Sequence, residues 1–131
     1  MDKSLEQFTN QDFLNLQTFR KNGEGVATPL WFVQDGKIIY VRTIAGSGKV
    51  KRVHNNSNVE IMPCGENGEP LGGWVPALAR ELGDAGTYAK VAGLLATKYG
   101  EQPKIYETNA ISRGEKYTVL EIRPKKQKTG D

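Results

Sequence analysis

The sequence is poor in the residues that most often carry metal or disulfide chemistry. Its 131 residues include one cysteine, Cys64, and one histidine, His54. A lone cysteine excludes an internal disulfide and a thiolate metal cluster, and a lone histidine excludes the usual zinc ligand sets. We therefore expect no metal site. Cys64 lies in a predicted strand and is interpreted as a small buried hydrophobe, and His54 as a surface or capping residue.

Long apolar runs are missing as well. No segment approaches the roughly 20 apolar residues that a membrane span requires, and the opening residues, "MDKSLEQ", do not resemble a secretory signal. The hydrophobic content of 37% and charged content of 25% are ordinary for a soluble globular protein. The expectation is one soluble, cytoplasmic domain over residues 1–131, with residues 1–10 and 125–131 flexible.

A strong charge of one sign is also absent. The net charge is +3, and part of it comes from the terminal stretch "RPKKQKTGD", so charge alone does not indicate nucleic acid. A nucleic-acid module is a hypothesis that the basic stretch and the aromatics raise. We disfavour it because the aromatics occur singly on strands that also look like core, and we expect neither a nucleic-acid nor a membrane partner.

What the sequence does contain is a series of short β-type runs. Six are predicted as strands: "FLNLQTFR", "VATPLWFV", "IIYVRT", "VEIMPC", "WVPALAREL" and "YTVLEIR". The turn sequence "QDGK" joins the second and third runs, so Val26–Thr43 is predicted to be a hairpin. Pro29 within the second run indicates an edge strand or a bulge.

Helical patterns are fewer. Ser4–Phe8 and Lys49–Asn55 are predicted as short helices. From Thr87 onward apolar residues recur at helical spacing, and Gly100 supplies a stop. The fold class that follows is mainly β, a six-stranded antiparallel barrel with a covering helix.

The segment "TIAGSGKVKR", Thr43–Arg52, combines a glycine-rich turn with basic residues and is a candidate anion site. It does not match a P-loop, because Thr43 stands where the first glycine is needed and Val50 where Ser or Thr would ligate magnesium. Nor does it match the dinucleotide fingerprint, because Lys51 replaces the third glycine. Another phosphate-bearing ligand remains open, beside the alternative of a solvated turn.

Five segments then occur in a recognisable order. They are "TPLWFV", "DGKIIYVRT", "SGKVKR", "NNSNVEIMPC" and "KYG", and they span most of Phe13–Gly100. In this combination the chain resembles the split β-barrel flavin and deazaflavin proteins of the pyridoxamine 5′-phosphate oxidase-like superfamily, especially their deazaflavin-dependent oxidoreductase branch. The resemblance implies an FMN-binding type of split barrel and a homodimer with the cofactor site at the subunit interface.

The resemblance also implies which residues bind the cofactor. Ser47–Arg52 would surround the phosphate, Thr28–Trp31 would line the ring, and Arg42 with Thr43 would lie between them. The full set is Thr28, Pro29, Leu30, Trp31, Arg42, Thr43, Ser47, Gly48, Lys49, Lys51, Arg52 and Trp74. Core or interface packing is an equal alternative for Trp31 and the favoured one for Trp74. Lys51 and Arg52 cannot both share one helix side with Lys49.

The function that the resemblance implies is hydride transfer between coenzyme F-420, or FMN, and a small organic acceptor. The residues themselves show no Ser/His/Asp or paired-carboxylate constellation, which is compatible with a cofactor that carries the chemistry. The alternative is a split barrel that binds flavin, haem or fatty acid without turnover, because fold does not determine activity. The segment Glu101–Glu115 matches no motif and is expected to belong to a substrate pocket.

Overall fold

The computed structural model describes residues 5–125. Its strands are β1 (Phe13–Phe19), β2 (Gly25–Leu30), β3 (Val33–Asp35), β4 (Ile38–Ile44), β5 (Asn58–Cys64), β6 (Val75–Leu82) and β7 (Tyr117–Pro124). Its helices are the 3-10 turn η1 (Glu6–Phe8), α1 (Gly48–Asn55), α2 (Ala85–Tyr99) and α3 (Gln102–Ser112). All seven strands form one antiparallel sheet in the order β2-β1-β5-β6-β7-β4-β3.

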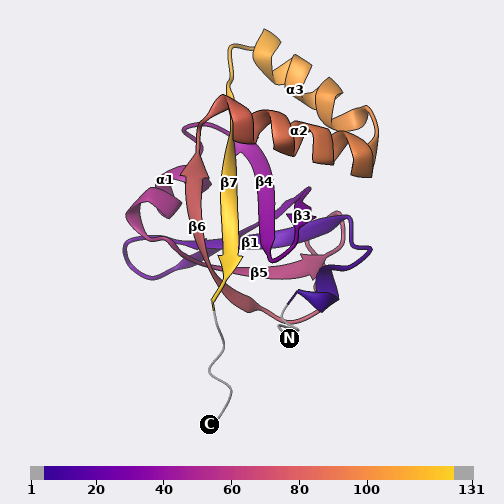
Figure 1. Ribbon diagram of the computed structural model, residues 1–131. Coiled ribbons are helices and arrows are strands. Elements are labelled where there is room, and N and C mark those ends of the chain that lie inside the picture. The colour runs from indigo at the N-terminus through magenta and orange to yellow at the C-terminus, as the bar shows by residue number, and fades with distance from the viewer. Residues whose placement is uncertain (1–4, 126–131) are drawn as a thin grey trace.

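This sheet is curled into a split β-barrel. Its two outermost strands, β2 and β3, are consecutive in the chain and only Trp31 and Phe32 join them. Leu30 and Val33 are three residues apart and can be separated by only about 10 Å of extended chain, so the two edges of the sheet must lie close together at this point. Figure 1 shows the result, with β4, β6 and β7 running across β1 and β5. The predicted mainly β, split-barrel fold is confirmed.

The strand count differs from the prediction, because the run "VATPLWFV" is two strands. Leu30 on β2 pairs with Leu14, whereas Val33 on β3 pairs with Tyr40. The chain changes partner strands between them, and Phe32 turns into the core with 1% of its surface exposed. The predicted hairpin over Val26–Thr43 is therefore only the β3–β4 pair, closed by Gly36 with φ +62°.

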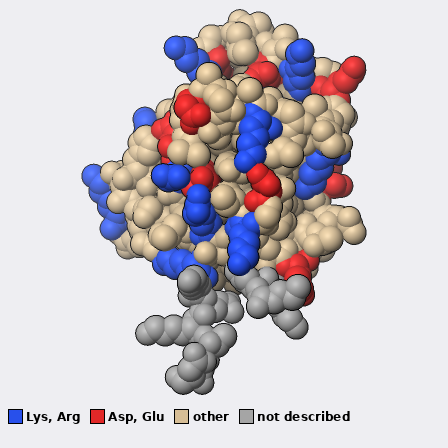
Figure 2. Space-filling view, in the orientation of Figure 1, with Lys and Arg blue, Asp and Glu red and all other residues tan. Residues whose placement is uncertain are grey.

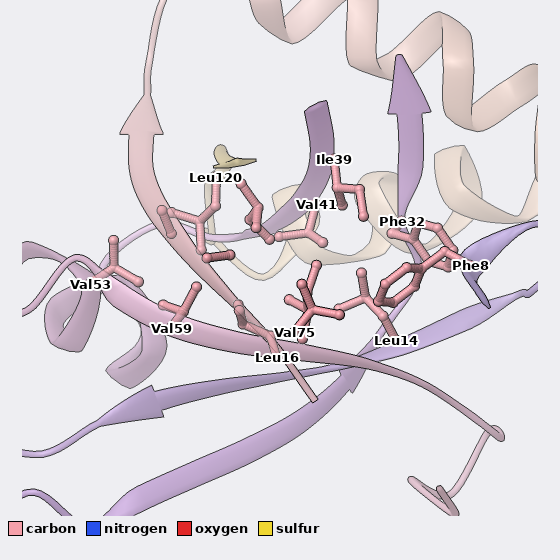
Figure 3. Packing of buried hydrophobic residues seen from close by; sticks show 14 of the residues in the cluster. Phe8, Leu14, Leu16, Phe32, Ile39, Val41, Val53, Val59, Val75 and Leu120 are labelled. Atoms are coloured by element: carbon pink, nitrogen blue, oxygen red, sulfur yellow. The ribbon is translucent and has the colours of Figure 1, made fainter. Parts of the chain in front are cut away.

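The core fills the concave side of the sheet. Figure 3 shows side chains from β1, β4, β5, β6 and β7 pointing toward one another there, together with Phe8 and Phe32. The two phenylalanine rings meet edge to face with centroids 5.8 Å apart. Leu5 and Phe8 are both buried. Residues 5–10 of the segment predicted to be flexible thus include two side chains that pack against the barrel, while residues 1–4 and 126–131 lie outside the described range.

A second apolar cluster lies on the outer side of the sheet. Val91 and Leu95 of α2 pack there against Tyr40 and Val119, which confirms the predicted covering helix. Asp84 caps the start of α2 by accepting a hydrogen bond from the Thr87 N–H at 2.8 Å. Gly100 ends it with φ +74°, a backbone conformation that side chains disfavour. Over residues 5–125, no helix has both the length and the apolar character to cross a membrane.

A charged cluster occupies the uncovered part of the outer face. Glu121 is 4% exposed and its Oε1 accepts hydrogen bonds from Arg80 Nε at 2.8 Å and Arg123 Nε at 2.9 Å. Figure 2 shows Lys and Arg side chains gathered on this side of the molecule with acidic ones between them. The hydrogen bond from Arg123, and then that from Arg80, hold the pKa of Glu121 below its ordinary value against the effect of burial.

Replacing Phe8 tests whether the N-terminal turn is part of the core. We expect Phe8→Ala to lower the free energy of unfolding by about 3 kcal/mol, because it removes a buried ring and leaves a cavity. Urea denaturation measures this difference. The matched control is Leu71→Ala, whose side chain is 56% exposed and should change stability by less than about 0.5 kcal/mol. Equal small effects of both variants would show that the turn does not contribute to the core.

The Glu121 cluster predicts a specific pH dependence of stability. A carboxyl group whose pKa is lower in the folded state stabilises the fold above its unfolded pKa, and this contribution is lost as pH falls through the folded pKa. Glu121→Gln should therefore cost about 1–2 kcal/mol at pH 7 and progressively less below the ordinary carboxyl value of 4.5. Urea denaturation at pH 7 and pH 3 compares the two proteins, and a difference independent of pH would contradict the assignment.

Candidate functional site

The segment between β4 and α1 forms a turn that exposes a helix start. Gly46 has φ +76°, and the Ser47 N–H donates to the carbonyl of Ile44 at 3.2 Å. The helix then begins at Gly48, so the predicted helix at Lys49–Asn55 is confirmed with one more residue. The first N–H groups of an α-helix have no partner within the helix and carry partial positive charge. This turn therefore presents donors suited to an anion.

The side chain of Ser47 is unusual for a residue at this position. Ser47 is the N-cap of α1, yet its hydroxyl does not cap the helix. The Oγ atom is buried and has no hydrogen-bond partner among residues 5–125. A buried hydroxyl without a partner costs free energy unless something supplies the missing bond. The arrangement fits a ligand oxygen that would accept from Ser47.

Lys49 is the second residue of α1, two positions after Ser47. Its Nζ donates to Thr43 Oγ1 at 3.0 Å, and it forms no ion pair with any carboxylate among residues 5–125. Burial, and then the nearby charge of Arg52, lower the pKa of Lys49 from its ordinary value. The negative charge of a bound anion would oppose both effects, because it favours the charged form of the lysine.

Arg52 completes the cluster from the same side of the helix. Its Nε donates to Thr18 Oγ1 at 2.7 Å. The guanidinium folds back over the helix start so closely that a Cβ on Gly48 would meet Nη1 at 2.8 Å. A side chain at position 48 would therefore make the end of Arg52 shift from this position. We call Thr43, Ser47, Gly48, Lys49 and Arg52 the anion cup.

The strand predicted to line a ring begins next to the anion cup. Thr18, which holds Arg52, lies opposite Val26 of β2, and Leu16 lies opposite Thr28. Thr28 is thus about 7 Å along the strand from the level of Arg52. Thr28, Pro29 and Leu30 are half-buried on an edge strand that pairs only with β1. A ligand whose anionic end entered the cup could extend along this edge.

The remaining predicted residues lie elsewhere. Lys51 is exposed, on a different side of α1 from the cup. Trp74 is 39% exposed and lies just before β6. Trp31 stacks on Tyr99 with centroids 5.2 Å apart. The side chain of Arg42 is 7% exposed and lies beneath α3, whereas Thr43 next to it belongs to the other face of β4. The structure therefore assembles the cup but does not bring Arg42, Lys51 or Trp74 into it.

The role of Thr18 and the presence of helix α3 were missed by the sequence analysis. Thr18 orients Arg52, and its position on the inner face of β1 after Leu14 and Leu16 was a usable signal, because a hydroxyl there needs a partner. The segment Glu101–Glu115 matched no motif, and it contains the whole of α3. Its apolar residues have no helical period, so periodicity gave no signal.

The side chains of the cup are hydrogen-bond donors and cations, which suit an anion. One hydroxyl, one ammonium, one guanidinium and free backbone N–H groups are donors that suit a phosphate group. No group of three or more His, Cys, Asp or Glu side chains within residues 5–125 is placed to hold a metal ion. His54 is exposed and its Nε2 pairs with Glu81 Oε1 at 2.7 Å, and Cys64 is buried.

Comparisons with known structures agree with this fold. The chain resembles the haem storage protein HutZ of Vibrio cholerae, with 17% identity, a TM-score of 0.70 and coverage of 93% of this chain and 87% of that one. It also resembles an FAD-binding protein of Mesorhizobium loti, with 15% identity, a TM-score of 0.63 and coverage of 95% and 87%.

A third similar structure comes from Clostridium acetobutylicum. It is a protein related to general stress protein 26, of the pyridoxinephosphate oxidase family, with 17% identity, a TM-score of 0.68 and coverage of 95% and 86%. At these identities the likeness shows the fold alone. No sequence among curated proteins matches the chain.

The sequence itself matches a family model along nearly its whole length. The model is that of pyridoxamine 5′-phosphate oxidase, and the match spans residues 1–129. Such a match, on a chain with this curled sheet, establishes the family independently of the similar structures. This protein belongs to the pyridoxamine 5′-phosphate oxidase family.

Proposed function

We propose that the anion cup binds the phosphate of a flavin-type cofactor, FMN or coenzyme F-420, and that the protein is an oxidoreductase acting on a small organic acceptor. The observation that carries the proposal is the buried hydroxyl of Ser47, which has no partner among residues 5–125 and lies at the N-cap of the helix that carries Lys49. The family match and the FAD-binding protein of the same fold support it. A ligand phosphate would accept from Ser47, from Lys49 and from the start of α1.

The residues would act by binding and orientation. When bound, the cofactor supplies hydride chemistry, which explains why no acid–base pair is needed near the cup. Arg52 would add positive charge while Thr18 keeps its guanidinium in place. Thr28, Pro29 and Leu30 would support the ring along the edge of β2, with Trp31 closing that edge by its stack on Tyr99.

The two cofactors place different demands on the surface around the cup. FMN ends in a compact phosphate, whereas coenzyme F-420 continues beyond its phosphodiester into an acidic tail. Lys51 is exposed on the same helix as the cup, and could meet such a tail. We infer that F-420 would use Lys51 and that FMN would not.

We further propose that the working form is a homodimer. The cup and the edge of β2 lie at the surface of one chain, so a ring bound there would be covered on one side only. Cofactor sites usually enclose most of their ligand, and a second copy of the chain would cover the other side. Sedimentation of the protein with and without cofactor measures this, and a monomer that binds cofactor at full affinity would contradict it.

The alternative is a carrier of the same fold that binds flavin, haem or fatty acid without turnover. The haem storage protein of V. cholerae shows that the fold occurs with such a role. The distinguishing measurement is anaerobic reduction of the bound cofactor followed by addition of organic acceptors. Reoxidation by an acceptor supports the enzyme, and stable binding without reoxidation across acceptors supports the carrier.

Lys49 gives the sharpest test of the cofactor site. Lys49→Ala should weaken FMN binding on the order of 10- to 100-fold, because one charge-assisted bond to the phosphate is lost. Fluorescence titration with FMN and with F-420 measures the two affinities. Lys51→Ala is the matched control for FMN, where it should have no effect, and it should weaken F-420 binding. Equal FMN affinity in Lys49→Ala and the parent would overturn the assignment.

We also expect Lys49 to contribute to cofactor binding and not to the stability of the cofactor-free protein. Its charge is partly desolvated and lies near Arg52, so Lys49→Met should leave the cofactor-free protein equally stable or up to about 1 kcal/mol more stable. Because its folded pKa is lowered, the parent should gain stability as pH rises from that pKa toward 10.5. Lys49→Met should lack this gain. Urea denaturation at pH 7 and pH 10, with Lys51→Met as control, measures both effects.

A further inference from the structure

A second cationic site lies on the outer face of β4, beneath α3. The guanidinium of Arg42 donates from Nη2 to the carbonyl of Pro103 at 2.8 Å and from Nη1 to Glu107 Oε2 at 3.4 Å. Its Cζ lies 5.0 Å from the ring centre of Tyr117 and 5.9 Å from that of Tyr88. With 7% of the side chain exposed, this is a buried cation held among aromatic rings and one carboxylate.

A small cavity adjoins this guanidinium. Its volume is about 40 Å³, and it is lined by Trp31, Arg42, Leu95, Pro103, Tyr106 and Tyr117. That volume has room for about one water molecule. Three aromatic walls, two aliphatic ones and a single cation are complementary to a flat apolar ring that bears one negative group. A ring could enter only if one wall moved.

The wall best able to move is α3. Of its residues, only Pro103 and Ala110 are buried, while Ile105, Tyr106 and Ile111 are each more than half exposed. Figure 1 shows α3 lying along α2, away from the strands. A segment with so few buried apolar contacts opens at low free-energy cost. It is attached over the cavity by the edge contact between Tyr106 and Trp31, at 5.3 Å, and by hydrogen bonds from Arg42 to Pro103 and from Tyr88 to Glu107.

Glu107 occupies the place that a ligand carboxylate would take. Its Oε2 accepts from Arg42 and also from the Tyr88 hydroxyl. The distance of 3.4 Å to Arg42 is longer than the roughly 2.7–2.9 Å of a strong charge-assisted bond. Exchange of this carboxylate for one that binds both Nη atoms would improve the geometry at Arg42. Tyr88 would still hold Glu107 once it is displaced.

We propose that the pocket between Arg42 and α3 binds a small planar aromatic carboxylate, which replaces Glu107 at the guanidinium and shifts α3 outward. The ring would pack among Trp31, Tyr106 and Tyr117. The site is separate from the anion cup, because Arg42 and Thr43 face opposite sides of β4. It shares Trp31 with the edge proposed to support the cofactor ring, so its occupancy is tested in the cofactor-free protein.

Benzoate is a suitable probe, and benzamide is its neutral counterpart of the same shape. NMR titration of the cofactor-free protein follows the indole N–H signals of Trp31 and Trp74, which Trp74→Phe assigns. Saturable movement of the Trp31 signal with benzoate, with Trp74 unaffected and benzamide at least tenfold weaker, is the expected result. Failure of benzoate to shift Trp31 in both the parent and Glu107→Gln would overturn the proposal.

Variants then test the exchange of carboxylates. Glu107→Gln keeps an acceptor for Tyr88 but removes the competing charge, and it should raise benzoate affinity about tenfold. Arg42→Gln should lower it at least tenfold, and Arg113→Gln, an exposed arginine just after α3, should leave it unchanged. Circular dichroism checks that each variant is folded. If Arg42→Gln is unfolded, the benzoate affinity of Glu107→Gln alone tests the proposal. Unchanged affinity in Glu107→Gln would contradict the mechanism.

Discussion

The partner exchange at Trp31 and Phe32 is the constraint on which the rest of the structure depends. Because β2 pairs with β1 and β3 pairs with β4, the chain must pass between the two edges of the sheet within two residues. That passage forces the sheet to curl and turns Phe32 into the core against Phe8. It also places Trp31 at the seam between the edges. Trp31 at this seam lines the pocket beneath α3.

The two sites lie on opposite faces of the sheet because successive side chains of β4 point to opposite faces. Thr43, on the concave side, holds Lys49 at the start of α1. Arg42, on the convex side, is held by Pro103 and Glu107 of α3. Two cationic environments of different character therefore lie one residue apart. The environment of Lys49 includes free backbone N–H groups and suits a phosphate. The environment of Arg42 is enclosed by aromatic rings and suits a flat carboxylate.

Most of the fold could be predicted from the sequence, because local pattern and long-range pairing agree in β1, β4, β5, β6, β7 and α2. The break between β2 and β3 could not, since the apolar run through Trp31 and Phe32 is continuous and only the choice of partner strand divides it. Helix α3 was missed because its stability does not come from one apolar face. A run without helical periodicity resembles a loop when read alone.

The candidate site was predictable to the extent that its residues are local in sequence. Ser47, Gly48 and Lys49 follow one another, so turn chemistry indicated them. The face on which Arg42 would lie was not indicated, because α2 covers the outer side of β4 and both sides of that strand are apolar: Ile39 and Val41 on one, Ile38 and Tyr40 on the other. Alternation identifies a core face only when the opposite face is polar.

The energetics of the two cations argue that they serve binding. A buried or half-buried cation is costly unless a carboxylate or a ligand compensates it. Lys49 has only a hydroxyl partner and a cationic neighbour, whereas Arg42 has a carboxylate, at a longer distance than a strong pair would show. A fold selected for stability alone could replace either with an apolar side chain of similar length. Lys49 lies near an unpartnered hydroxyl in sequence, and Arg42 lies beside an aromatic cavity. Such groups are expected in a ligand site, because polar groups that are placed to bind a ligand lack some of their hydrogen bonds when the ligand is absent.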